Sequence, residues 1–372
     1  MIYFDHAATT PMRKEVQTAM EEYFSKNFGN PSSIHQIGQN ARMALDQASY
    51  TISNILNCSP QEIIFTSGGT ESNNLAIQGL CKAKGSGHII TSQIEHPSIY
   101  KTLQHLEKEG FSVTYLPVDR DGEISLKDVE KAVQEDTILI SIHYTNNEIG
   151  TIQEVTKIGR IAEKHSIPFH IDAVQAAAFL DISVNKLKCT MLSLSAHKLY
   201  GPKGIGLLYK KANTALTPLF FGGGQEHQLR SGTENIPGII GFAKALELIE
   251  EEKEKLSEHT KYLRDIFIQE IQKEIPAAFV NGPKDPEVKL PNNANICFPE
   301  HNGESLLIRL DMAGICASMG SACSSGSLDA SPTLLALGLT QKEALSSLRF
   351  SFGRDNTKEE VIELVKKLKE FM

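Results

Sequence analysis

The 372-residue sequence has no apolar run that could cross a bilayer and no excess of basic charge. About 20 predominantly apolar residues are needed to span a membrane, and residues 1–6 lack the basic and apolar regions of a secretory signal. There are 37 Lys and Arg residues against 45 Asp and Glu residues, which gives a net charge of -8. We therefore expect no transmembrane segment, no direct nucleic-acid binding and a cytoplasmic location.

The six cysteines also lack the spacing of a metal site. No C-x-x-C pair is present, and six thiols in a chain of this length do not suggest a disulfide framework. We expect reduced thiols and no bound metal. The sequence has no visible internal repeat or low-complexity segment either.

The chain contains short apolar runs that alternate with helix-length segments. Seven runs are expected to be strands: 63–66, 88–91, 113–116, 137–142, 168–171, 191–194 and 206–209. This alternation predicts an α/β fold whose mostly parallel sheet is covered by helices.

A length of 372 residues suggests two domains. The charged amphipathic stretch 241–275 predicts one long helix, broken by Pro276, before strand-like and helical segments resume. We place the boundary near this helix. The large domain is predicted to span 15–247, and a smaller α+β domain to combine 1–14 with 248–372.

Two charged residues follow predicted strands. Asp172 comes directly after the run ending at Ile171, and Lys198 follows the next run along the chain. Pyridoxal phosphate needs a lysine amine to bind its aldehyde covalently and an acid beside its pyridine nitrogen. Most Asp and Lys residues are helix caps or surface charges, but Lys198 precedes a Tyr-Gly-Pro-Lys-Gly turn. Both residues are expected at the carboxyl ends of strands, where open α/β sheets bind ligands. Asp172 and Lys198 together therefore predict a pyridoxal phosphate site.

The segment 66–74, TSGGTESNN, follows a strand and opens a helix. Helix amino termini favour anions, and the segment lacks the Gly-Lys-Ser/Thr of a P-loop and the spacing of a dinucleotide fingerprint. A capped helix after a glycine turn would give the same pattern. Together with Asp172 and Lys198, the segment favours a site for one phosphate without magnesium.

Two further loops follow predicted strands. His96 could supply an aromatic plane or an acid/base group, and Asn147 could direct an amide at a ring hydroxyl. A single histidine is more often structural, and Asn-rich turns are common. Each signal is weak when taken singly.

A run of small residues, 318–327, surrounds one thiol, Cys323. Small neighbours should leave its sulfur accessible, which suits a nucleophile that takes a group from one partner and delivers it to another. The other thiols are expected to be small hydrophobic side chains: Cys58, Cys81, Cys189, Cys297 and Cys316.

Taken together, these segments resemble a cysteine desulfurase of the nitrogen-fixation and iron-sulfur-assembly group, within the class V aminotransferase superfamily. The resemblance runs through nearly the whole chain and rests on 5–11, 29–33, 66–74, 95–97, 147–150, 170–175, 195–204, 230–234, 320–327 and 348–351. It implies a fold-type I pyridoxal phosphate enzyme, a homodimer, and conversion of L-cysteine to L-alanine with the sulfur left as a persulfide.

The resemblance also implies residue roles. Lys198 would carry the cofactor and then act as a base at the substrate α-carbon, Asp172 would pair with the pyridinium, and Cys323 would attack the substrate sulfur. At the cofactor ring, the resemblance implies contacts from Gln175 and Asn147, with His96 stacked on the ring and serving in proton transfer. At the phosphate it implies Gly69, Thr70, Ser195 and His197, together with Thr233 at the phosphate of the neighbouring subunit. At the substrate carboxylate it implies Arg349 with Asn147 and Asn30.

Three other functions remain open. An ordinary aminotransferase would need Lys198 and Asp172 but not Cys323, and a catalytically silent binding protein would need none of them. A selenocysteine lyase is less favoured because desulfuration gives Cys323 an obligatory role. The expected partner is a sulfur acceptor, either an iron-sulfur scaffold or a thiolation enzyme. The short segment after Arg349 favours a dedicated acceptor, since the housekeeping enzymes carry a longer tail.

Overall fold

The structure is a computed structural model that describes residues 1–320 and 329–372. Its largest sheet has seven strands: β2 (Ile63–Thr66), β3 (His88–Ser92), β4 (Ser112–Leu116), β5 (Thr137–His143), β6 (Phe169–Asp172), β7 (Met191–Ser195) and β8 (Gly206–Lys210). Each predicted strand is confirmed to within one residue at either end. β-Branched and other apolar side chains make these runs suited to a sheet buried on both faces.

The strand order is β2-β8-β7-β6-β5-β3-β4, and the five strands from β7 to β4 run parallel. β8 is antiparallel to both of its neighbours. The predicted mostly parallel sheet is therefore confirmed. Because the parallel strands all end at one edge, the residues that follow β3, β5, β6 and β7 come together there.

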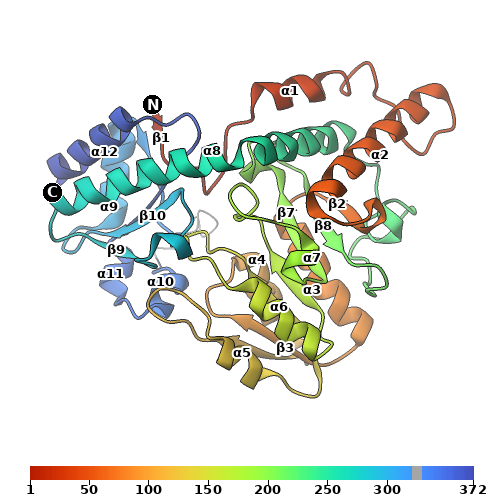
Figure 1. Cartoon of the computed structure of the whole chain (residues 1–372), viewed down its shortest axis with the longest axis horizontal. Helices are drawn as coiled ribbons and strands as arrows, with labels where there is room; N and C mark the ends of the chain where they lie inside the picture. The colour runs from red at the N-terminus through yellow and green to blue at the C-terminus, as the bar shows by residue number, and fades with distance from the viewer. Residues whose placement is uncertain (321–328) are drawn as a thin grey trace.

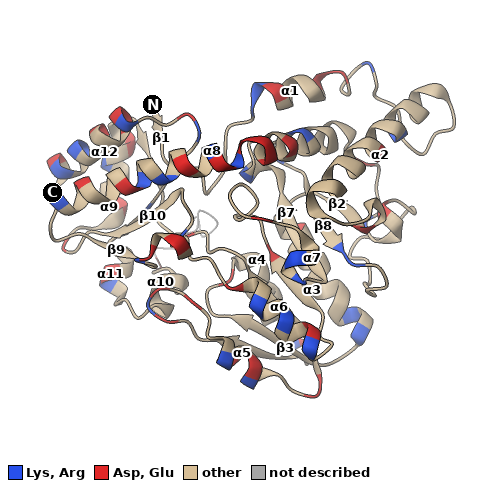
Figure 2. Ribbon diagram, viewed as in Figure 1, with Lys and Arg blue, Asp and Glu red and all other residues tan. Residues whose placement is uncertain are grey.

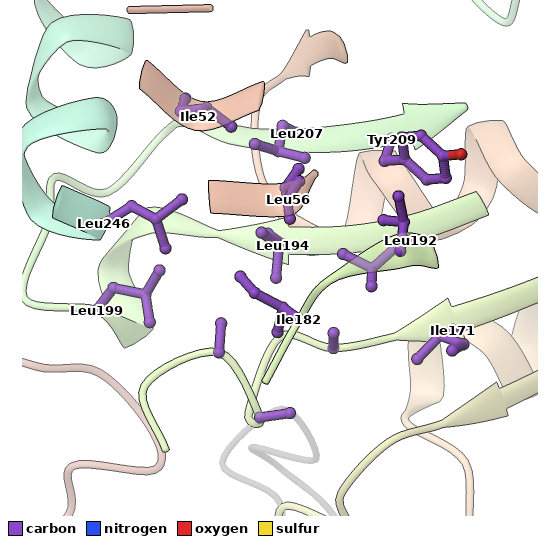
Figure 3. Packing of buried hydrophobic residues seen from close by; sticks show 14 of the residues in the cluster. Ile52, Leu56, Ile171, Ile182, Leu192, Leu194, Leu199, Leu207, Tyr209 and Leu246 are labelled. Carbon is purple, nitrogen blue, oxygen red and sulfur yellow. The ribbon is translucent and has the colours of Figure 1, made fainter. Parts of the chain in front are cut away.

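Helices cover both faces of this sheet (Figure 1). In this part of the chain they are α1 (Lys14–Glu21), α2 (Gln36–Leu56), α3 (Gly69–Lys84), α4 (Pro97–Lys108), α5 (Leu126–Ala132), α6 (Val155–Lys164) and α7 (Val184–Leu187). Figure 3 shows Ile52 and Leu56 of α2 packed close to Leu194 of β7 and Leu207 of β8. On the opposite face, α3 and α4 form a second apolar cluster with β2, β3, β5, β7 and β8.

One long helix, α8 (Ile236–Glu274), connects this core to the rest of the molecule. Residues of its first half, such as Leu246, pack with the large sheet, whereas Phe267 and Ile271 pack in a separate apolar cluster. The helix ends before Pro276, as predicted. It begins five residues earlier than predicted because the Asn235 side chain accepts a hydrogen bond from the Gly238 amide and a proline follows in the first turn.

The separate cluster is built on two small sheets. Parallel β1 (Ile2–Tyr3) and β11 (Ile315–Cys316) form one, and antiparallel β12 (Ser347–Ser351), β10 (Asn293–Cys297) and β9 (Phe279–Asn281) form the other. The helices here are α9 (Gly303–Met312), α10 (Pro332–Ala336), α11 (Gln341–Leu345) and α12 (Lys358–Phe371). This is the predicted α+β arrangement, and the exact domain boundary stays a prediction.

Basic and acidic residues are interspersed along α8 and α12 (Figure 2). Such mixing is typical of solvated helix faces. Within the described ranges, no helix combines the length and the apolar character that a membrane crossing requires.

Candidate active site

Most of the predicted site residues line one cavity at the carboxyl edge of the large sheet. They are Gly69, Thr70, His96, Asn147, Asp172, Gln175, Ser195, His197, Lys198 and Arg349. Parallel pairing of β5 with β6 sets His143 beside Asp172, and pairing of β6 with β7 sets Asp172 beside Ser193. The sheet register thus brings together groups that lie far apart in the sequence.

Asp172 is a buried carboxylate at the end of β6, with 7% of its surface exposed. Its Oδ2 accepts a hydrogen bond from Asn73 Nδ2 at 2.7 Å, and its Oδ1 accepts one from the Val174 amide at 3.0 Å. Asn73 also donates to Ser98 Oγ at 2.9 Å. Asn73 and the Val174 amide therefore fix the direction of the Asp172 carboxyl group in the cavity.

Lys198 lies on a short 3-10 turn, residues 196–198, that directly follows β7. Its Nζ donates hydrogen bonds to the Ala7 and Ala8 carbonyl oxygens at 2.5 and 2.7 Å. Gln175 Nε2 donates to the same Ala7 oxygen at 2.9 Å. The amino-terminal segment therefore supplies backbone acceptors that hold the lysine amine in the cavity.

His96 precedes α4 and caps its first turn. Its Nδ1 accepts a hydrogen bond from the Ser98 amide at 3.1 Å and lies 2.7 Å from Ser98 Oγ. Acceptance at Nδ1 favours the tautomer with its proton on Nε2. Burial lowers the pKa of His96, with Lys198 acting in the same direction and Asp172 against it. The ring is therefore neutral near pH 7, which suits stacking on another aromatic ring.

The amino terminus of α3 forms one wall of the cavity. A Cβ at Gly69 would lie 2.7 Å from Val174 Cγ2, so a larger residue here would force the Val174 side chain to move. Ser195 and His197 line the same end of the cavity. Burial lowers the pKa of His197 to about 4, and its Nδ1 lies 3.1 Å from Thr9 Oγ1. Neutral donors and free helix amides are the groups that bind a phosphate.

Arg349 projects from β12, with its side chain 1% exposed. Its Nη2 forms an ion pair with Asp5 Oδ1 at 2.7 Å, and its Nη1 donates to the Asn147 carbonyl oxygen at 3.1 Å. Among the described residues its buried Nε has no hydrogen-bond partner. A second carboxylate arriving in the cavity would therefore share or replace the contact with Asp5.

Sequence reasoning missed a buried pair, Glu95 and His143. His143 Nδ1 lies 3.3 Å from Glu95 Oε2, and Ser92 Oγ donates to Glu95 Oε1 at 2.5 Å. Burial works against a charge on the ring, but the carboxylates of Glu95 and Asp172 together outweigh it and raise the pKa of His143. The signal was available, because His143 directly follows the predicted strand 137–142.

Three predicted residues do not line this cavity. Asn30 is exposed and its Oδ1 accepts a hydrogen bond from the Ser32 amide at 2.9 Å. Thr233 is exposed in the loop before α8. Cys323 lies outside the described residues. The roles of all three stay predictions.

The cavity fits pyridoxal phosphate on its own chemistry. A carboxyl group, a lysine amine and an imidazole converge beside the amino terminus of α3, where Gly69 packs closely against Val174. Within the described ranges, four buried polar atoms of cavity-lining residues have no hydrogen-bond partner: Asn73 Oδ1, His143 Nε2, Thr145 Oγ1 and Arg349 Nε. Buried polar atoms normally have partners, and a polar ligand in the cavity could supply them.

Comparison with known proteins agrees with this chemistry. The class V aminotransferase profile matches residues 2–364. The chain is 48% identical to the cysteine desulfurase IscS of Dictyoglomus turgidum over 363 residues, covering 97% of this chain and 91% of that one. A solved NifS-like protein matches all of the chain and 98% of its own with a TM-score of 0.93 at 37% identity. The structure of SspA in complex with cysteine covers 95% of this chain and 99% of its own, with a TM-score of 0.83 at 40% identity. The chain therefore belongs to the class V aminotransferase family and, within it, to the cysteine desulfurases.

Proposed function

We propose that this protein converts L-cysteine to L-alanine with pyridoxal phosphate and captures the sulfur as a persulfide on Cys323. One observation carries the proposal. Asp172, Lys198 and Arg349 line a single cavity in a chain that belongs to the cysteine desulfurases. The first two serve the cofactor, and the third provides a cation for the carboxylate of an amino acid.

Bound pyridoxal phosphate supplies an electron sink that stabilises negative charge on the substrate α-carbon. Asp172, held in place by Asn73 and the Val174 amide, would pair with the ring nitrogen and hold it protonated. Ser195, His197 and the α3 amino terminus would hold the phosphate, and His96 would stack on the ring. These contacts orient the cofactor against Lys198.

Lys198 would first carry the cofactor and then move a proton. Once substrate has replaced it, its Nζ removes the proton from the substrate α-carbon. The Ala7 and Ala8 carbonyls that accept from Nζ keep the amine in the cavity. Arg349 would orient the substrate through its carboxylate, since a guanidinium can bind both oxygens at once.

Sulfur transfer needs a thiolate, which we assign to Cys323. Its sulfur attacks the substrate sulfur, a sulfur-sulfur bond forms and the bond from Cβ to sulfur breaks. The electron pair of that bond stays on Cβ, which is protonated to give alanine. L-Cysteine and one enzyme thiol thus become L-alanine and one enzyme persulfide, with no outside oxidant.

Partners and location complete the proposal. A homodimer would let Thr233 reach the phosphate of the neighbouring subunit, and its exposed position is compatible with this role. The persulfide would pass to a sulfur acceptor, either an iron-sulfur scaffold or a thiolation enzyme. The described cysteines are all free, which suits a reducing cytoplasm.

The direct test is to supply the purified holoenzyme with L-cysteine and a thiol reductant, without any keto acid. We expect alanine and sulfide in equal amounts, measured by amino-acid analysis and a sulfide assay. An ordinary aminotransferase would instead need a keto acid as amino acceptor and would release no sulfide. That second pattern would overturn the proposed function.

A further inference from the structure

Glu148 is a buried acid that the reaction described above does not use. It is 5% exposed and lies between Asn147 and Ile149, in the loop that follows β5. Its backbone is fixed at both ends, because its amide donates to Asn146 Oδ1 at 2.8 Å and its carbonyl accepts from Asn295 Nδ2 at 3.2 Å. Such rigid support leaves the carboxyl group with a defined direction.

That carboxyl hydrogen-bonds to one end of the segment 320–331, which contains Cys323, and lies close to the other end. On one side, Ser331 Oγ donates to Glu148 Oε2 at 2.5 Å. On the other side, a Cβ built on Gly320 would lie 2.9 Å from the same oxygen and 3.5 Å from Ser331 Cβ. Gly320 has a positive φ of 56°, so a larger residue would be disfavoured both by its backbone and by Glu148. Gly320 and Ser331 therefore both lie close to one carboxyl oxygen of Glu148.

The same loop contacts the residue proposed to bind substrate. Arg349 Nη1 donates to the carbonyl oxygen of Asn147, the residue before Glu148. The backbone of Arg349 also exchanges two hydrogen bonds with Ser318, at 3.1 and 2.7 Å. The substrate site and both ends of the Cys323 segment are thus joined through one short loop.

Burial raises the pKa of the Glu148 carboxyl, while Ser331, Arg349 and Thr333 act in the opposite direction. An unpaired buried carboxylate is costly, and the hydrogen bonds from Ser331 and Thr333 reduce that cost. Removing Glu148 would leave the Ser331 hydroxyl without its acceptor.

We propose that Glu148 is a positioning residue for sulfur transfer, which joins Gly320 and Ser331 to the loop that contacts Arg349. The inference rests on the proposed function and deepens it. Loss of Glu148 should slow the attack by Cys323 on substrate sulfur and should spare proton removal at the α-carbon by Lys198. These two steps can be measured separately.

The first measurement uses L-alanine, which has no sulfur to transfer. Exchange of its α-proton for solvent deuterium, followed by proton NMR on the holoenzyme, reports the Lys198 step alone. The second measurement uses L-cysteine and follows persulfide on the protein by mass spectrometry, together with alanine release. In Glu148→Ala we expect persulfide formation to fall by about 100-fold, as for a misplaced reacting group, with exchange changed less than about twofold.

Conservative and matched variants sharpen the test. Glu148→Gln keeps a hydrogen-bond acceptor for Ser331 and should retain most of the sulfur transfer. Ser331→Ala should slow persulfide formation by about tenfold, because it removes one hydrogen bond to a buried acid. It should leave α-proton exchange unchanged. Ser331 also caps α10 by accepting a hydrogen bond from the Leu334 amide. The control is therefore Ser125→Ala, which removes the equivalent cap of α5. This control variant should change neither rate.

Each outcome decides the inference. Equal slowing of exchange and sulfur transfer in Glu148→Ala would make Glu148 a general structural residue, and no slowing of either would make it irrelevant. If Glu148→Ala does not fold, Ser331→Ala with its Ser125→Ala control decides in the same way. A wild-type protein that exchanges the α-proton of alanine but forms no persulfide from L-cysteine would overturn the proposed function instead.

Discussion

Replacing Lys198 by alanine should abolish alanine production from L-cysteine. The amine is held in the cavity by the Ala7 and Ala8 carbonyls, and it is the group proposed both to carry the cofactor and to remove the α-proton. Loss of a general base alone costs up to about 10,000-fold in rate. We therefore expect a fall of at least about 1,000-fold, measured as alanine released by the cofactor-loaded protein.

The absorbance of the cofactor provides an independent measurement of this variant. The band of the lysine-bound cofactor should be present in the wild type and absent in Lys198→Ala. A matched control is Lys157→Ala on the outer surface of α6, where the side chain is exposed and pairs with Glu154; it should keep both the band and the activity. An unchanged band in Lys198→Ala would show that another group binds the cofactor.

Replacing Cys323 by serine should abolish sulfide and alanine release from L-cysteine while leaving α-proton exchange on L-alanine intact. A serine hydroxyl is a far weaker nucleophile near neutral pH than a thiolate and cannot form a persulfide. The cofactor and Lys198 are untouched by this change, so the first step should continue. We expect a loss of sulfide release by at least about 100-fold, measured with a thiol reductant present.

The other cysteines provide the control for this variant. Burial raises the pKa of Cys58 to about 12, that of Cys81 to about 12 and that of Cys297 to about 11, so their thiols are poor nucleophiles. No described cysteine lines the active-site cavity. Cys58→Ser should therefore keep full activity. Full sulfide release by Cys323→Ser would show that the persulfide does not form on Cys323, or does not form at all.

The strands of the large sheet could be predicted because each is a short apolar run between turn residues, and burial on both faces needs little else. Asp172, Lys198 and His96 could be placed because they follow such runs, and parallel strands end at one edge. Periodicity and position relative to a strand are local signals. These local signals therefore predict the site residues that lie at the edge of the large sheet.

The remaining contacts depend on chain segments that meet only in the folded protein. The ion pair of Arg349 with Asp5 joins residues 344 positions apart, and no pattern in either segment indicates the other. The hydrogen bond from Ser331 to Glu148 likewise spans 183 positions. The start of α8 was missed for a different reason, since its first turn is set by the Asn235 cap and not by an apolar stripe.

The central claim is that sulfur from L-cysteine is captured on Cys323. The most direct measurement is to load the purified holoenzyme with L-cysteine labelled at sulfur, remove excess substrate, and locate the label by peptide mass spectrometry without reductant. The account predicts label on the peptide that contains Cys323 and, after transfer, on an acceptor protein or on RNA that it modifies. Alanine formation with no label on Cys323 would contradict it.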